Sequence, residues 1–313
     1  MKLKDLKIPS IEEILLEILK SSVFPISIRE IEERMKEYSA SITEQRIKRA
    51  IRSLEKEGYD INLVISGKDT KYSLVREGRR FKMMGKVRTP FIASSDFHIG
   101  SKGFSEQAFK ELVKCTKKEK VKDIVSVGDL IQGLGVYSVE AMDVLEPSIS
   151  KQIDSLVEHL REFPKEVKIH ISIGGHEEKL KGKWAIGLDP LKAASQRLPN
   201  VLYYGAAMNL LLNDRWSVLG LHSSGVSSYA GYRVQSIYRN LQDPRPNLLI
   251  IGHSHRLYTL SIPPETLLIE SGCLQRESSY LLNKGYTSQV GWVLVRKFER
   301  GYIEASYVKP VIY

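Results

Sequence analysis

The first 57 residues carry the 3.6-residue repeat of amphipathic helices. Apolar residues recur three or four positions apart in three stretches, namely Ile11, Ile14, Leu15 and Ile18, then Ile28, Ile31 and Met35, then Ile47, Ala50, Ile51 and Leu54. Each stretch is introduced by a Ser with a Glu three residues later, which are Ser10 with Glu13, Ser27 with Glu30, and Ser41 with Glu44. Such pairs satisfy the free amides of a first helical turn. We expect three helices that share one core.

Two β-like runs follow Gly58, and they change the picture from a helical bundle to a mixed domain. Residues 61–65 read INLVI and residues 71–75 read KYSLV, with the polar SGKDT between them. This spacing and turn chemistry predict a hairpin. Three helices followed by a hairpin resemble the winged helix-turn-helix domain, which we assign to residues 1–80. In that family the third helix enters the major groove and the hairpin contacts the backbone.

The polar face of the third helix predicts DNA binding. It presents side chains three or four positions apart, and the hairpin adds two lysines; the residues are Gln45, Lys48, Arg49, Arg52, Lys56, Lys68 and Lys71. A solvated helix surface and a protein-interaction module are the alternatives. We favour DNA binding because the stripe contains no acidic residue. The basic residues 81–90 are then interpreted as a linker that follows a phosphate backbone.

From Phe91 onward, strand-like runs alternate with amphipathic helices, which predicts an α/β fold. The runs are FIASS (91–95), DIVSV (123–127), KIHISI (168–173), SVLGL (217–221) and NLLII (247–251). Each run ends in a polar or glycine-rich loop, and function in α/β folds gathers in the loops at the carboxyl ends of strands. The chemistry of those loops therefore decides the function.

Every one of these strand ends carries a residue that can bind a metal ion. In chain order they are Asp96, His98, Asp129, His176, His222, His253 and His255. Carboxylate oxygen and imidazole nitrogen without thiolate suit manganese, iron, zinc and similar ions. Any one of these residues alone is typical of a structural turn residue. The series D-x-H, GD, GH-E, H and GH-x-H, each after a strand, indicates a metal site.

These residues resemble the five signature motifs of calcineurin-like metallophosphoesterases, over residues 88–313. The resemblance implies two mixed β-sheets packed as a sandwich with flanking helices, in a domain assigned to residues 91–313. It implies two divalent cations, manganese in preference to iron, zinc, nickel or magnesium, and in-line attack on phosphorus by a hydroxide that bridges them. The implied roles are a first metal held by Asp96, His98 and His255, Asp129 as bridge, a second metal held by His222 and His253, and His176 as general acid or charge stabiliser.

Two positions depart from the family pattern. Gly175 stands where relatives have an Asn that binds the second metal, so we expect that second site to be weaker, more hydrated or completed by another donor. Gln132 stands where some relatives have an Asp that hydrogen-bonds the histidine of the third motif. A Gln can orient an imidazole without stabilising its charged form. We therefore expect His176 to be a poorer acid.

Three functions remain open at this point. A phosphodiesterase or nuclease acting on nucleic acid is favoured, because the other presumed ligands persist and a DNA-binding module raises the local concentration of substrate. The second is a DNA-binding protein whose phosphoesterase domain is degenerate, with weak activity or none. The third is a nucleotide phosphomonoesterase.

Composition and charge agree with a polyanionic partner. The 313 residues carry a net charge of +10 with a pI near 9.3, which favours nucleic acid. Residues 1–90 contain 20 Lys and Arg against 14 Asp and Glu. The two cysteines, Cys115 and Cys273, are expected to be buried thiols. Without a signal sequence or a long apolar run, we expect a cytoplasmic protein with no membrane partner; a homodimer agrees with the resemblance.

The remaining candidates are assigned to structure or left open. His159 lies on a helix and His170 within a strand, so both are interpreted as structural. Tyr229, Tyr232 and Arg233 follow His222 and have two interpretations: they stack on a base in a substrate groove, or they pack at a helix start, which we prefer. Glu177 and Glu178 either orient His176, substitute as a ligand, or only complement the helix dipole.

Overall fold

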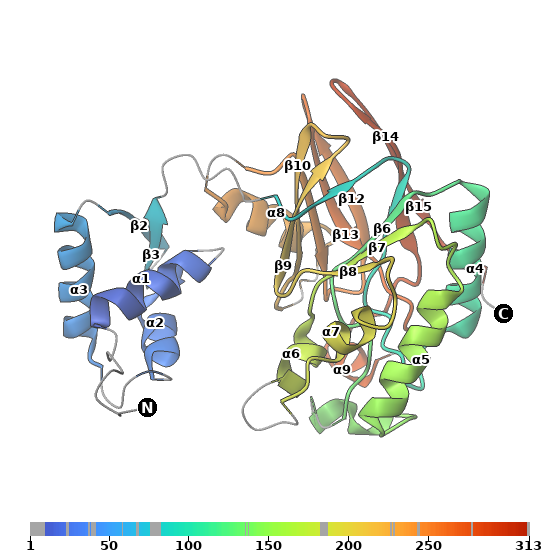
Figure 1. Cartoon of the computed structure of the whole chain (residues 1–313), viewed down its shortest axis with the longest axis horizontal. Coiled ribbons are helices and arrows are strands. Elements are labelled where there is room, and N and C mark those ends of the chain that lie inside the picture. The colour runs from blue at the N-terminus through green and yellow to red at the C-terminus, as the bar shows by residue number, and fades with distance from the viewer. Residues whose placement is uncertain are drawn as a thin grey trace. The chain divides into compact units, whose positions relative to one another are not determined.

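The structure is a computed structural model of the whole chain (Figure 1). It forms two compact units, the smaller built mainly from residues 1–80 and the larger from residues 81–239 and 245–313; each is described by itself. The residues described are 10–22, 25–36, 38, 42–57, 59–66, 69–75, 83–134, 136, 138–181, 187–225, 227, 229–242, 245–276 and 278–311. In this part of the chain, no helix is both long and apolar enough to cross a bilayer.

The smaller unit contains the three helices and the hairpin expected from the sequence. The helices are α1 (Ile11–Ser21), α2 (Ile28–Met35) and α3 (Glu44–Lys56). The strands β1 (Ile26–Ser27), β2 (Asp60–Ser66) and β3 (Asp69–Val75) form an antiparallel sheet in the order β1-β3-β2. The apolar residues of all three helices share one core with residues of β1, β2 and β3. Its assignment to the winged helix-turn-helix family stays a prediction.

Two of the three expected helix caps are confirmed. The Ser10 hydroxyl accepts from the Glu13 amide at 3.1 Å and the Glu13 carboxylate accepts from the Ser10 amide at 2.8 Å; Ser27 and Glu30 repeat this arrangement. The third expectation is wrong, because α3 begins at Glu44 after Thr43, which makes no side-chain cap. Ser41 lies outside the described residues. The helix is held by burial of its apolar face rather than by a cap.

The larger unit consists of two six-stranded mixed sheets with helices on the outside, which confirms the expected fold class. The first sheet has the order β12-β13-β11-β10-β9-β4 and the second β15-β14-β5-β6-β7-β8. The first comprises β4 (Gly85–Val87), β9 (Ala207–Leu212), β10 (Trp216–His222), β11 (Leu248–Gly252), β12 (Leu257–Ile262) and β13 (Thr266–Ser271). The second comprises β5 (Phe91–Ala93), β6 (Asp123–Ser126), β7 (Lys168–Ile171), β8 (Val201–Tyr203), β14 (Trp292–Glu299) and β15 (Tyr302–Val308).

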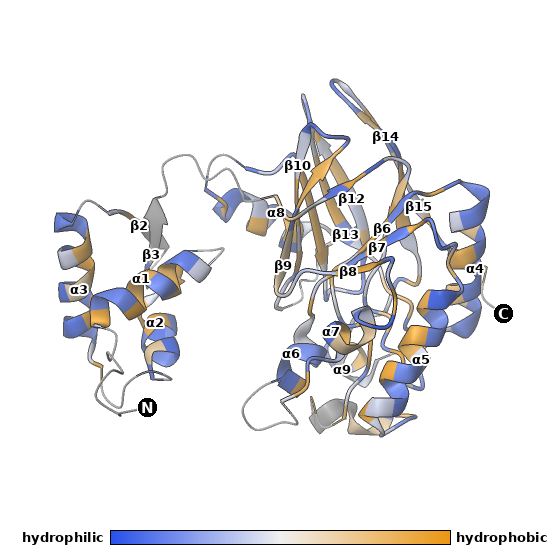
Figure 2. Cartoon of the chain, viewed as in Figure 1, coloured by the Kyte–Doolittle hydropathy of each residue, from blue (hydrophilic) through white to orange (hydrophobic). Residues whose placement is uncertain are grey.

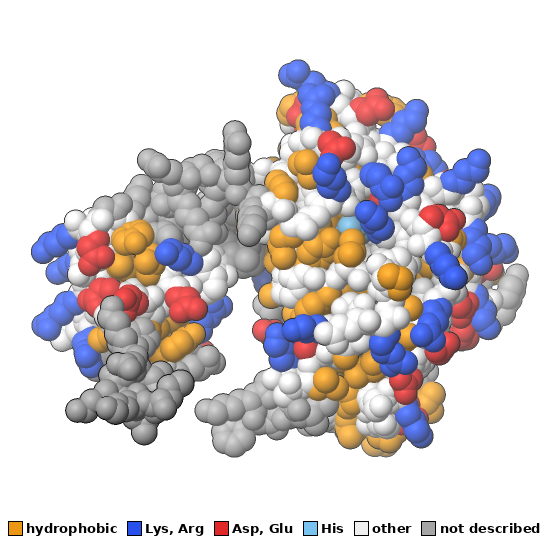
Figure 3. Space-filling view, in the orientation of Figure 1, with side chains coloured by type: hydrophobic (Ala, Val, Ile, Leu, Met, Phe, Trp, Pro, Cys, Tyr) orange, Lys and Arg blue, Asp and Glu red, His pale blue; other side chains and the backbone are white. Residues whose placement is uncertain are grey.

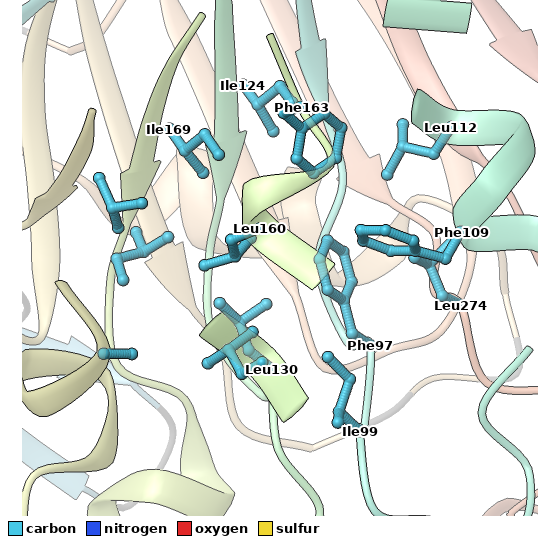
Figure 4. Packing of buried hydrophobic residues seen from close by; sticks show 14 of the residues in the cluster. Phe97, Ile99, Phe109, Leu112, Ile124, Leu130, Leu160, Phe163, Ile169 and Leu274 are labelled. Atoms are coloured by element: carbon cyan, nitrogen blue, oxygen red, sulfur yellow. The ribbon is translucent and has the colours of Figure 1, made fainter. Parts of the chain in front are cut away.

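Helices cover the sheets and connect the parallel strands. They are α4 (Glu106–Lys118), α5 (Ile149–Arg161), α6 (Gly175–Lys181), α7 (Pro190–Ser195), α8 (Tyr232–Asn240) and α9 (Ser279–Asn283), with the 3-10 helix η2 (Ser138–Asp143). The apolar residues of α4 and α5 lie on the side turned to the second sheet (Figure 2). Figure 4 shows this core, where the rings of Phe97 and Phe109 meet edge to face at 6.1 Å. A second core lies between the sheets.

The prediction that residues 81–90 form a linker is wrong for residues 85–87. Gly85–Val87 form β4, which pairs in parallel with β9, and the Met84 amide donates to the Asn209 carbonyl at 2.7 Å. Arg88 donates from Nε to the buried Asp123 carboxylate at 2.9 Å. A basic composition favours solvent exposure only on average. The backbone of residues 85–87 makes sheet hydrogen bonds with β9 in spite of it.

His170 belongs to a buried network that joins β6, β7 and the residue after β8 in the second sheet. Its Nε2 lies 3.0 Å from Asp123 and its Nδ1 lies 2.9 Å from the Tyr204 hydroxyl. Burial raises the pKa of Asp123, but hydrogen bonds from His170 and Arg88 outweigh it and leave that pKa lowered. The structural interpretation of His170 therefore fits its surroundings. His159 likewise lies in a structural setting, packed against Phe104 and Phe109.

Candidate metal centre

All seven metal-capable residues come together at one edge of the larger unit. The strands β5, β6 and β7 run parallel in one sheet, and β10 and β11 run parallel in the other, so within each sheet the carboxyl ends lie at one edge. Donor atoms within 4.8 Å of one another form three groups: Asp96, His98 and His255; His98, Asp129 and His176; Asp129, His222 and His253. Because His98 and Asp129 each belong to two groups, the three groups form one continuous centre.

The backbone at this centre is strained. Among the described residues other than glycine, eight have a positive φ, and five of them are metal-capable: Asp96, His98, Asp129, His253 and His255. Such a conformation costs free energy for residues with a Cβ and clusters at functional sites. The loops turn sharply as soon as each strand ends, and these turns aim side chains from separate loops at one point.

Two glycines make room for the carboxylates. A Cβ on Gly174 would lie 2.2 Å from the Asp129 amide nitrogen and 2.3 Å from Asp129 Oδ1. A Cβ on Gly252 would lie 2.8 Å from Asp96 Oδ2 and 3.1 Å from His222 Nδ1. Side chains at these positions would collide with the centre, so the glycines beside the motifs serve close approach of two loops.

Hydrogen bonds at Nδ1 orient three of the imidazoles. His98 Nδ1 lies 3.0 Å from Gln132 Oε1, His176 Nδ1 lies 2.6 Å from the Gln132 backbone carbonyl, and His222 Nδ1 lies 2.7 Å from the Val127 carbonyl. An imidazole that donates from Nδ1 keeps a lone pair on Nε2, as a metal ligand needs. The expectation that the Gln132 side chain orients His176 is corrected: the side chain contacts His98, and the backbone carbonyl contacts His176.

The centre fits divalent cations. His222 Nε2 is buried, lies 3.0 Å from Asp129 Oδ2, and makes no hydrogen bond to any described residue. The Nε2 atoms of His98 and His255 lie 3.1 Å apart. Buried polar atoms without partners cost free energy, and a cation among these nitrogens and carboxylate oxygens would satisfy them. The donor set is that of manganese, iron, zinc and similar ions.

The first half of the centre is extensively hydrogen-bonded. Asp96, His98 and His255 are buried, with 0%, 3% and 6% exposed surface, and the His222 side chain in the second half is also only 5% exposed. Asp96 is further held by the Ser95 hydroxyl and by the His253 amide, which donates to both carboxylate oxygens at 3.0 and 3.1 Å. The side chains of both halves are thus largely shielded from solvent.

The charges of the centre shift the pKa values of its members. Burial raises the pKa of Asp129, but the charges of His222 and His176 outweigh it, so the pKa lies well below its usual value. Burial lowers the pKa of His222, but Asp129 outweighs it and raises that pKa to about 10. Burial and the charge of His222 lower the pKa of His253 to about 4. The carboxylates are therefore ionised and His253 is neutral at pH 7, as ligands must be, whereas His222 would release a proton on binding a cation.

Glu177 has a role that the sequence analysis did not settle. Its buried carboxylate accepts from four backbone amides, those of Asp129 at 3.0 Å, Leu130 at 2.6 Å, Ile131 at 3.1 Å and Gly174 at 2.9 Å. Burial and the charge of Asp129 raise its pKa to about 7, while the amides act in the opposite direction. Glu177 therefore fastens the loop after β6 to the loop after β7, and Glu178 is exposed.

The structure places most of the expected DNA-contacting residues on the surface. Gln45, Arg49, Arg52 and Lys56 are exposed on α3. Figure 3 shows Lys and Arg side chains along the left edge of the smaller unit, where Figure 1 labels α3. Lys48 is also exposed, but it pairs with Glu44 at 2.6 Å. The stripe therefore does contain an acidic neighbour, contrary to the sequence argument. Lys71 is half-buried, and Lys68 lies outside the described residues.

Two further expectations are corrected by the exposure of side chains. Tyr229 and Tyr232 have 76% and 57% exposed surface, so the preferred interpretation as packing residues is wrong. Cys273 is buried as expected, whereas Cys115 is only half-buried.

Comparisons with known proteins give local sequence relatives of one kind. No protein-family model matches the chain. It is 38% identical over 94 residues to the DNA polymerase II small subunit of Archaeoglobus fulgidus, and 31% identical over 143 residues to that of Thermoplasma acidophilum. The Halobacterium salinarum subunit is 23% identical over 224 residues. These matches cover 26%, 44% and 59% of this chain, but only 19%, 29% and 44% of the relatives.

Solved structures give more remote likenesses. The Escherichia coli phosphoesterase Yfce is 17% identical, with a TM-score of 0.38 over 70% of this chain and 98% of its own. The nuclease MPE of Pseudomonas putida is 11% identical, with a TM-score of 0.34 over 70% of this chain and 87% of its own. Likenesses this remote say nothing about activity. The observed two-sheet fold and the gathered Asp and His residues are what the metallophosphoesterase resemblance implies.

Proposed function

We propose, from the premise that the larger unit has the calcineurin-like metallophosphoesterase fold, that this chain is a metal-dependent phosphodiesterase acting on nucleic acid. The observation that carries the proposal is the convergence of two ionised carboxylates and oriented imidazoles from five loops. The buried His222 Nε2, whose contact with Asp129 Oδ2 at 3.0 Å lacks hydrogen-bond geometry, supports it.

The side chains divide into roles by their grouping. Asp96, His98 and His255 would hold one cation, His222 and His253 the other, and Asp129 would contact both. Two cations so held would activate water for in-line attack and neutralise charge on the phosphate. Manganese suits this mixture of oxygen and nitrogen donors, as do iron, zinc and nickel. No protein nucleophile is needed, because phosphoryl transfer depends on positioning and charge neutralisation.

His176 is the candidate proton donor or charge stabiliser. Its backbone amide donates to Asp129 Oδ1 at 2.8 Å, and its Nδ1 donates to the Gln132 carbonyl, which directs Nε2 toward the centre. Its ring meets that of His98 at 4.7 Å, nearly perpendicular. A carbonyl fixes the ring without the charge that a carboxylate would add. His176 therefore works mainly by position.

Nucleic acid is the proposed substrate for two reasons. The sequence relatives are named DNA polymerase II small subunits, and α3 presents an exposed basic face. Phosphate contacts made by such a face give sequence-independent affinity that depends on salt.

The basic face of α3 can be tested by replacing Arg49 and Arg52 with Ala together. We expect duplex DNA affinity to fall roughly tenfold at 0.1 M salt, and the slope of log affinity against log salt to become shallower by about 2, because two phosphate contacts are lost. Fluorescence anisotropy in a salt series measures both. Arg29→Ala, an exposed arginine on α2, is the matched control. An unchanged slope in the double variant would contradict DNA binding by this face.

A manganese titration tests the catalytic proposal. Wild-type protein is expected to hydrolyse a phosphodiester only with a divalent cation, with a rate that keeps rising at high manganese because Gly175 leaves the second site without one donor side chain. Restoring the missing donor with Gly175→Asn should bring half-saturation to about tenfold lower manganese. Rates and bound metal per chain, measured by elemental analysis, are the readouts.

Gly187→Asn provides the matched control, because a Cβ at Gly187 meets no atom within 4 Å and the residue lies outside the centre. The proposal would be contradicted if neither wild type nor Gly175→Asn hydrolysed the phosphodiester with manganese, iron, zinc, nickel or magnesium.

A second candidate is a polymerase-associated subunit whose phosphoesterase domain turns over slowly or not at all. The names of the relatives favour it, and so does Gly175, which lacks a donor side chain. Bound metal without hydrolysis in the same titration would be its signature.

A further inference from the structure

We propose that Tyr229, Tyr232 and Arg233 form a nucleotide subsite beside the metal centre, in which the tyrosines stack on an unpaired base and Arg233 binds a neighbouring phosphate. This inference rests on the proposed function and names its substrate class: a strand with at least one unpaired nucleotide next to the cleaved bond.

The buried carboxylate of Glu270 links the subsite to the metal centre through hydrogen bonds. Glu270, with 1% exposed surface, lies on β13. Its Oε2 accepts from the Ser254 hydroxyl at 3.2 Å and its Oε1 from the Val234 amide at 3.4 Å. Ser254 lies between His253 and His255, and Val234 lies in the first turn of α8. The start of α8 and the metal-capable loop after β11 are therefore both hydrogen-bonded to Glu270.

The turn before α8 is packed closely against the first sheet. Gly231 has a φ of +74°, and a Cβ there would lie 2.1 to 2.5 Å from the ring of Tyr258 on β12. The backbone between Tyr229 and Tyr232 is therefore pressed against the sheet, which fixes the place of both tyrosines.

The two tyrosines have the exposure of a stacking surface. Tyr229 and Tyr232 have 76% and 57% exposed surface although they flank a closely packed turn. Aromatic side chains held in this way bind the π-face of any base, with a gain of roughly tenfold in affinity per base. A base inside a duplex has both faces covered by its neighbours, so only an unpaired base can use this surface.

Arg233 supplies the second, independent observation. Its guanidinium donates from Nη2 to the Ser224 hydroxyl at 3.4 Å, and Ser224 lies two residues after His222. Its Nε is buried without a hydrogen bond to any described residue, and no described carboxylate forms an ion pair with it. Guanidinium groups with free donors suit phosphate oxygens. The arginine would thus bind the backbone on the His222 side of the centre.

The test compares two substrates in the full-length protein with manganese. One is tetrathymidylate, which offers bases but few phosphates to α3, and the other is methyl p-nitrophenyl phosphate, a diester without a nucleobase. We expect Tyr229→Ala/Tyr232→Ala to raise KM for tetrathymidylate at least about tenfold, and by a factor several times larger than for the small diester. The Tyr229→Phe/Tyr232→Phe variant should stay within about twofold of wild type, because stacking needs the ring and not the hydroxyl.

Tyr302→Ala is the matched control, since Tyr302 has 51% exposed surface on β15 and lies outside the subsite. Arg233→Gln should reduce the salt slope of tetrathymidylate binding, measured by calorimetry, by about 1. Equal effects of the Ala variant on both substrates would overturn the subsite while leaving the proposed function intact. Loss of tetrathymidylate binding in the Ala variant, with no hydrolysis by wild type, would support the subsite and refute the catalytic proposal.

Discussion

The Asp129→Ala variant is expected to lose metal-dependent phosphodiester hydrolysis by at least about a thousandfold. Asp129 is the one carboxylate placed within reach of both His98 and His176 on one side and of His222 and His253 on the other. Its removal takes away the shared ligand. It also removes the negative charge that raises the pKa of His222, so that pKa should fall. Bound metal should fall from two ions to one or none. Steady-state rates with saturating manganese and elemental analysis check both results.

The conservative Asp129→Asn variant separates charge from shape. Its amide oxygen can still accept from the His176 amide, so the fold around the site should persist while the second metal is lost. Asp154→Asn is the matched control, because Asp154 is an exposed carboxylate that pairs with Arg197 at 2.6 Å on the helical side. Wild-type hydrolysis by Asp129→Ala would mean that the cluster is not the site of chemistry.

The positions of the metal-capable residues could be predicted because each lies at or shortly after the end of an apolar strand. Asp96 comes three residues after Ala93 ends β5, and His253 comes directly after Gly252 ends β11. Parallel strands bring their ends to one edge whatever the details of packing. The sequence therefore contains the centre as a pattern of strand ends, although its members span more than 150 positions.

The partners of those residues could not be predicted in the same way. Gln132 was expected beside His176, but its side chain faces His98, because one residue offers its carbonyl and its amide in different directions. Residues 85–87 were assigned to a linker, although they pair with β9. Both outcomes depend on contacts between segments that lie far apart in the sequence. Local composition does not predict such contacts.

Two buried glutamates stabilise the strained loops around the centre. Glu177 accepts from amides of the loops after β6 and β7, and Glu270 accepts from Ser254 and from the start of α8. Positive φ at Asp129 and His253 costs free energy that such contacts must offset. Carboxylates outside the three metal-capable groups thus help to hold the backbone that brings those side chains together.

The Glu177→Ala variant is expected to lose at least about 4 kcal/mol of unfolding free energy, since four buried amides would each lose a partner at about 1 to 3 kcal/mol. That is a large share of the stability of a typical domain, about 5 to 15 kcal/mol. Chemical denaturation measures the loss. Hydrogen exchange gives it a location, because the amides of Leu130 and Ile131 should exchange faster than those of β10, which do not contact Glu177.

Glu177→Gln should have an intermediate effect, because one amide oxygen still accepts from the loop while the new NH2 group faces donors. Glu178→Ala is the matched control: its side chain is exposed in the same helix, and its loss should change stability by no more than about 0.5 kcal/mol. Equal stability of the Glu177→Ala and Glu178→Ala variants would show that the amides of Asp129, Leu130 and Ile131 find other partners. The loop would then hold Asp129 in place without the carboxylate.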